Sequence, residues 1–149
     1  MEELTDMNNK LFLKLQNSNI VLFYDLILFE AKYPVLFTCL DQNNILYLVS
    51  CYTVDAEKRA WIIVETTEET VIKLLENQIQ IYSAFTRNDY VYQVIKFIEN
   101  EPVVTKKFFF EIDIKILPTV GYYMDSDKHE FDDEIAILKV RSLLKETKS

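Results

Sequence analysis

The chain has 149 residues, of which half are hydrophobic and 13% are aromatic, and its formal net charge is −8. This length and composition predict one domain with a packed core and exclude a disordered chain. The negative charge disfavours binding to nucleic-acid phosphates. The single glycine, Gly121, excludes a glycine-rich phosphate loop, because such loops need several glycines for close backbone approach.

The first forty residues favour strands over a membrane span. Residues 1–19 fit either an N-terminal helix or arm, from leucines three and four apart, or the start of a strand in LFLKL. The apolar run 21–40 is interrupted by Asp25, Glu30, Lys32 and Pro34, whereas a spanning helix needs about 20 uninterrupted apolar residues. The run therefore predicts two buried strands, at about 20–30 and 34–40.

Two further strands and a helix follow. A polar turn at 41–44 leads into a strand at 45–52, and another strand is expected at 60–66. The segment TTEETVIKLLENQI predicts a helix at about 67–77, with Thr66 as its cap and Glu69 reaching back to it.

The remaining third of the chain completes an α+β pattern. Strands are predicted at 90–99 and 103–116, the second from its regular alternation of apolar and charged residues, and a helix at about 131–146. The expected fold is a single α+β domain, 1–149, with a mostly antiparallel sheet, one central helix and a C-terminal helix. The apolar stripe of that last helix is wider than one small sheet needs to cover, so segment 128–149 is expected to mediate self-association.

The two cysteines and the first ten residues indicate the cellular compartment that the sequence predicts. A turn at 41–44 places Cys39 opposite a residue near 48 rather than Cys51, which favours two free thiols and a reducing environment. The opening MEELTDMNNK lacks the basic and apolar regions of a secretory signal. A cytoplasmic location without membrane association is expected.

Catalytic and metal-binding patterns are scarce. His129, the only histidine, lies among acids and is interpreted as a solvated loop residue. The acid-rich segment DSDKHEFDDE lacks the central glycine and the ligand spacing of a calcium loop. Glu111 and Asp113, if they project from one strand, resemble nuclease metal ligands, although an exposed sheet face explains them as well. The sequence predicts no metal site, no cofactor and no enzymatic activity.

Aromatic and basic residues interleave in RNDYVYQVIKF and TKKFFF. Arginine and lysine pair with phosphates, and aromatic rings stack on bases. The candidate ligand-binding residues are Arg87, Tyr90, Tyr92 and Lys107, for a nucleotide-like ligand; ordinary strand composition is the alternative explanation.

Two short motifs, FYDLILFEA at 23–31 and LPTVG at 117–121, carry a resemblance. They resemble small uncharacterised domains of bacteria and phages that have a Tyr-Asp…Leu-Phe-Glu strand and a late Leu-Pro…Gly. The matching positions are Tyr24, Asp25, Leu28, Phe29, Glu30, Leu117, Pro118 and Gly121. The resemblance implies an α+β fold and no particular activity.

Three functional hypotheses follow. The first is a non-catalytic binding module, a phage-encoded or accessory counter-defence factor that sequesters a nucleotide-like signal as a homo-oligomer. The second is an acidic inhibitor or adaptor that docks on a basic host protein. The third is a metal-dependent phosphodiester hydrolase that uses Glu111 and Asp113.

Overall fold

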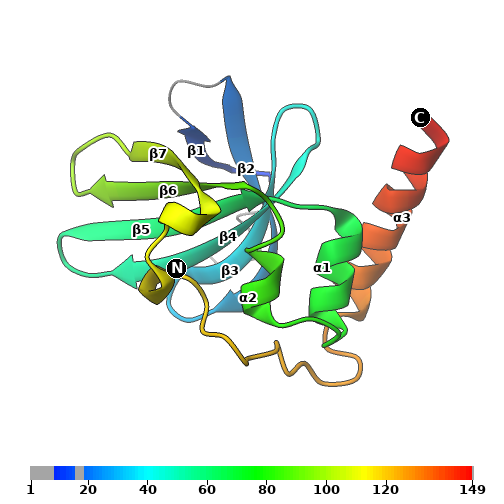
Figure 1. Ribbon diagram of the computed structural model, residues 1–149. Helices are drawn as coiled ribbons and strands as arrows, with labels where there is room; N and C mark the ends of the chain where they lie inside the picture. The colour runs from blue at the N-terminus through cyan, green and yellow to red at the C-terminus, as the bar shows by residue number, and fades with distance from the viewer. Residues whose placement is uncertain (1–8, 16–18, 149) are drawn as a thin grey trace.

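The computed structural model describes residues 9–15 and 19–148, and it confirms the α+β class. Seven strands form one antiparallel sheet in which each strand pairs with its neighbour in sequence, as Figure 1 shows. The strands are β1 (Leu11–Leu15), β2 (Ile20–Glu30), β3 (Pro34–Leu40), β4 (Leu46–Val54), β5 (Lys58–Glu65), β6 (Tyr90–Phe97) and β7 (Val103–Phe108).

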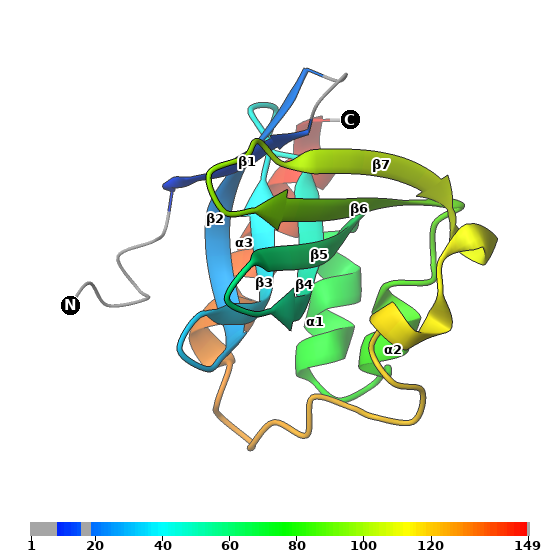
Figure 2. The same cartoon turned by 90° about the vertical axis from the view of Figure 1, so that its left-hand side faces the viewer.

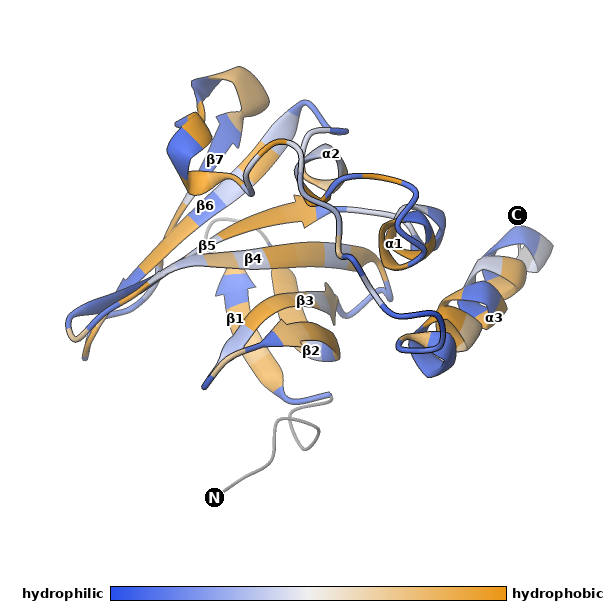
Figure 3. Ribbon diagram, turned by 90° about the horizontal axis from the view of Figure 1, so that it is seen from below, coloured by the Kyte–Doolittle hydropathy of each residue, from blue (hydrophilic) through white to orange (hydrophobic). Residues whose placement is uncertain are grey.

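The helices cover one face of this sheet. They are α1 (Glu68–Leu75), α2 (Ile81–Ala84) and α3 (Asp132–Lys148), with two short 3-10 turns at Phe109–Glu111 and Ile114–Ile116. α3 packs beside α1 at the outer end of the molecule (Figures 1 and 3). Among the described residues, no helix combines the length and the apolar character needed to cross a membrane.

The sheet is curled and buries side chains on both faces, which explains the near-continuous apolar strands (Figure 2). Successive residues of β4 alternate between two clusters: Leu46 and Leu48 pack toward the helices, whereas Tyr47 and Val49 pack on the other face with Trp61. The second cluster also contains Phe12, whose ring meets that of Trp61 edge-on at 5.2 Å. Residues 11–15 therefore form a strand that closes one side of the domain.

Two ion pairs orient α3. The Arg141 guanidinium donates hydrogen bonds of 2.7 and 2.8 Å to the two carboxylate oxygens of Asp25 in β2. The Asp25 carboxylate also accepts a 2.9 Å bond from the Thr38 hydroxyl. The bonds that Arg141 donates to the Asp25 carboxylate raise the pKa of Arg141 above its ordinary value. One turn further along α3, Lys145 donates a 2.6 Å bond to Glu68, which is buried at the start of α1.

The structure corrects several local predictions. The strand expected at 103–116 ends at Phe108, and two 3-10 turns replace its second half. The cap of α1 is Thr67, whose side chain accepts a bond from the Thr70 amide, rather than Thr66. Cys39 pairs with Tyr47 across the β3–β4 hairpin, one residue from the expected position. Both cysteines are free thiols, as predicted, although Cys51 is only half-buried. Residues 1–8 lie outside the described part of the chain.

Candidate functional site

The best-formed hollow is an apolar cleft of about 450 Å³ between the sheet and the segment 117–124. Its floor is a row of cross-strand partners, in which Phe29 of β2 pairs with Leu36 of β3, and Leu36 pairs with Ser50 of β4. Directly paired residues project to the same face of a sheet, so these three side chains lie side by side. The volume falls within the range of small-molecule pockets.

A bulge in β2 directs Phe29 into this row. Ile27 pairs with Phe37, but Phe29, two residues on, pairs with Leu36, only one residue along β3. The extra residue in β2 moves Phe29 from the face of Phe37 to the face of Leu36. Phe29 remains 57% exposed, one residue before the end of β2.

Hydrogen bonds to α2 fix the opposite wall of the cleft. The Gly121 amide donates a 2.7 Å bond to Oε1 of Gln80, and the Ile81 amide donates a 2.9 Å bond to the Tyr122 carbonyl. Gly121 has φ = +99°, a conformation that favours glycine. Further on, the Ser126 hydroxyl donates a 2.6 Å bond to the Leu75 carbonyl at the end of α1. The single glycine of the chain is therefore used where the wall bends.

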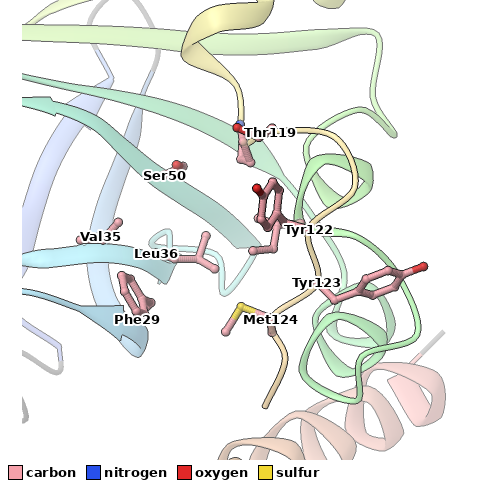
Figure 4. Close-up of a pocket in the computed structure, with 10 residues that line it drawn as sticks. Phe29, Val35, Leu36, Ser50, Thr119, Tyr122, Tyr123 and Met124 are labelled. Carbon is pink, nitrogen blue, oxygen red and sulfur yellow. The ribbon is translucent and has the colours of Figure 1, made fainter.

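Figure 4 shows how the side chains lie in the cleft. The ring of Tyr122 is turned toward Leu36 and Ser50, and Met124 closes the lower end, whereas the ring of Tyr123 points away from the strands. The Ser50 hydroxyl has no hydrogen-bond partner within the described part of the chain. A cleft of this kind offers aromatic and aliphatic contacts with one available hydroxyl at its floor, and none of the described residues that line it is charged.

A second, more polar hollow of about 370 Å³ lies where β6 and β7 meet the segment 87–89. It brings together three of the four ligand-binding residues predicted from the sequence: Arg87, Tyr90 and Tyr92. The fourth, Lys107, does not line this hollow. Lys106 takes that place, and its Nζ atom lies 4.7 Å from the ring centre of Tyr90 and 5.8 Å from that of Tyr92.

Strand register explains why Lys106 replaces Lys107. Lys106 pairs with Tyr92, and Lys107 pairs with Val91, which is buried in the core on the helix side. Neighbouring residues of a strand point to opposite faces, so only Lys106 shares a face with Tyr92. The sequence indicates that Tyr90 and Tyr92 share one face of β6, because they alternate with the apolar Val91, which lies on the buried face.

Exposed aromatic rings continue from this hollow. The rings of Tyr90 and Phe108 lie 4.5 Å apart, and Phe110 stacks on Phe108 at 5.3 Å with an angle of 14° between the planes. Phe110 is 81% exposed. Two carboxylates, those of Glu65 and Asp89, also line the hollow, so its charges balance those of Arg87 and Lys106.

The acidic residues considered for hydrolysis are arranged differently from the prediction. Glu111 and Asp113 lie in the 3-10 region rather than on one strand. Each carboxylate accepts a local backbone bond of 3.0 Å, from the Phe108 and Lys115 amides respectively. His129 is exposed and contacts Asp132 at 2.8 Å. Within residues 9–15 and 19–148, no group of three or more histidine, cysteine or acidic side chains is placed to hold a metal ion.

Comparison with known proteins adds no relative: no family model, curated protein or solved structure matches this chain.

Proposed function

We propose that the protein is a non-catalytic binding module and that the cleft between β2–β4 and segment 117–124 holds its ligand. The ligand is a flat, mainly apolar molecule that stacks on the Tyr122 ring and hydrogen bonds with the Ser50 hydroxyl. The observation that supports this proposal is the cleft itself. A bulge in β2 places Phe29 in its floor, and hydrogen bonds to the start of α2 hold its wall.

The chemistry of the lining supports an apolar ligand. The lining contributed by residues 9–15 and 19–148 contains no charged side chain, and burial of a charged ligand against it would carry an uncompensated desolvation cost. Aromatic rings gain additional energy from offset or edge-on stacking, about 0.5–1.5 kcal/mol for each ring pair. Phe29 in the floor and Tyr122 in the wall both line the cleft, so a planar ligand contacts both.

A fluorescent, uncharged aromatic probe, N-phenyl-1-naphthylamine, tests the proposal. We expect saturable fluorescence enhancement with the wild-type protein and roughly three- to tenfold weaker binding to Tyr122→Ala, from loss of one ring contact. The matched control is Tyr123→Ala, because Tyr123 borders the cleft but its ring points away from the strands that form the floor. Equal affinity of the two variants, or absence of saturable binding to the wild type, would contradict the proposal.

A second candidate function is recognition of a nucleotide-like ligand at the hollow of Arg87, Tyr90, Tyr92 and Lys106. The observation that favours it is the position of the Lys106 ammonium over two tyrosine rings, beside an arginine that is free to reach a phosphate. Exposed Phe108 and Phe110 extend the stacking surface for a base. The negative net charge of the chain makes a small nucleotide a better partner than a polynucleotide.

Adjacent lysines provide the control for this second function. Thermal stabilisation by a panel of mono- and cyclic dinucleotides is expected in the wild type, lost in Lys106→Ala and retained in Lys107→Ala, because only Lys106 lines the hollow. If no nucleotide stabilises the protein, or if the Lys107 variant alone loses the effect, this candidate function is wrong.

A further inference from the structure

The inward face of α3 is held by contacts that fix how the helix is rotated. Phe131 and Leu138 are buried against the core, and Arg141 and Lys145 are paired with Asp25 and Glu68. The apolar residues predicted as one wide stripe therefore divide between two faces. The part that is not buried must point away from the domain.

The outward face of α3 is apolar and exposed. At about 100° per residue, Val140 lies roughly opposite the buried Phe131 and Leu138. Four large side chains on this face are 41–61% exposed: Ile137, Val140, Leu143 and Leu144. Figure 3 shows α3 at the edge of the domain, beside α1 and apart from the sheet. Contiguous apolar surface of this kind on a small domain is typical of an association site.

The spacing on this face is symmetric about Val140. Ala136 and Ile137 lie four and three residues before it, and Leu144 and Leu143 lie four and three residues after it. A two-fold symmetric interface requires that each contact is repeated with the roles of the two copies exchanged. Two antiparallel α3 helices that cross at Val140 satisfy this requirement. Ile137 and Leu144 lie on one side of Val140 and Ala136 and Leu143 on the other, so Ile137 of one copy meets Leu144 of the other and Ala136 meets Leu143.

The charges select the antiparallel orientation. α3 begins with Asp132, Asp133 and Glu134 in its first turn. A parallel pair would bring the two acidic turns together, and like charges in contact oppose association. In the antiparallel pair they are separated by most of the helix, on the order of 20 Å, because residues 132–134 of one copy lie level with residues 146–148 of the other.

We propose that a second copy of this chain covers the outward face of α3, through an antiparallel, two-fold symmetric helix pair centred on Val140. A contact confined to one helix from each copy is at the small end of specific interfaces. The dimer is therefore concentration-dependent rather than permanent. This inference is independent of both ligand sites, which lie on other elements.

Sedimentation velocity across a concentration series into the high micromolar range tests the dimer. We expect a monomer–dimer equilibrium for the wild type and at least about tenfold weaker dimerisation for Val140→Glu. The matched control is Ile98→Glu, which places the same charge on an equally exposed apolar position in the β6–β7 hairpin and should dimerise normally. A wild type that is monomeric at every concentration, or a Val140→Glu variant that dimerises like the wild type, would overturn the proposal.

Cysteine cross-linking tests the orientation. Because Ile137, Val140 and Leu144 are 41–56% exposed, variants at these positions are expected to fold, and circular dichroism checks this. Oxidation of a mixture of Ile137→Cys and Leu144→Cys proteins should give the mixed dimer, whereas neither variant alone should cross-link efficiently. A homodimer from Ile137→Cys alone would indicate a parallel pair and overturn the proposed geometry. Wild-type protein, with Cys39 and Cys51, gives the background.

Discussion

Replacement of Arg141 by Met tests how α3 is attached to the sheet. The side chain of Asp25 is only 6% exposed and accepts three hydrogen bonds, two of them from Arg141. Arg141→Met leaves a buried carboxylate with the Thr38 hydroxyl as its remaining side-chain donor. Loss of one partner of a buried ion pair typically costs 3–5 kcal/mol. Since the Arg141 side chain is 28% exposed and water reaches this end of the pair, we expect about 3 kcal/mol.

Substitution of the partner, Asp25, should lower the free energy of unfolding by less than Arg141→Met does, and this difference tests the reasoning. In Asp25→Asn the guanidinium can turn toward solvent, and the amide oxygen still accepts one bond, so a loss of about 1–2 kcal/mol is expected. Replacement of both residues by Leu removes the buried charge altogether and should restore stability to within about 1 kcal/mol of the wild type. Urea unfolding followed by the fluorescence of Trp61, the single tryptophan, measures all three variants. The reasoning is refuted if Asp25→Asn costs more than Arg141→Met.

Three further predictions concern the core, α1 and the cleft wall. Burial raises the pKa of the Cys39 thiol well above its ordinary value and that of Tyr24 to about 12, so the unfolded chain loses these protons first. Unfolding free energy should therefore fall as pH rises above about 8.5, and urea titrations at alkaline pH should show a smaller fall in Cys39→Ala. Thr67→Ala should lower the free energy of unfolding by about 1 kcal/mol through loss of the α1 cap, whereas Thr66→Ala should not; equal effects would contradict the assignment. Gly121→Ala forces an L-residue into φ = +99°, although its Cβ meets no neighbouring atom. We expect a loss of about 1 kcal/mol in the free energy of unfolding and several-fold weaker binding of N-phenyl-1-naphthylamine. Unchanged binding would show that the cleft wall does not depend on this bend.

The strands were predictable because their burial on both faces produces long apolar runs separated by polar turns. The segment after Phe108 was not, because its alternating residues imitate a half-exposed strand. There, the carboxylates of Glu111 and Asp113 accept backbone bonds from residues nearby in sequence, which stabilises turns in place of a ladder. Alternation alone does not distinguish these outcomes when charged residues can cap the backbone locally.

The two candidate sites differ in how far the sequence could predict them. The hollow of Arg87, Tyr90 and Tyr92 is built largely from one short segment, so these residues could be predicted together from their closeness in the sequence. The prediction of Lys107 instead of Lys106 was wrong by one residue along β7. The cleft combines residues from β2, β3 and β4 with a segment seventy residues later. Its position also depends on the bulge before Phe29, which reverses the face expected from simple alternation.

Occupation of the cleft is tested most directly at Met124. Met124 lines the cleft and is the one methionine within the described part of the chain, so its ¹³C-labelled methyl group reports binding there, with Met124→Leu to assign the signal. We predict that N-phenyl-1-naphthylamine shifts this resonance saturably, over the same concentrations as the fluorescence change, and that Tyr122→Ala raises the concentration required. A methyl resonance that stays unmoved while the probe fluorescence saturates would place the binding elsewhere and contradict the proposed function.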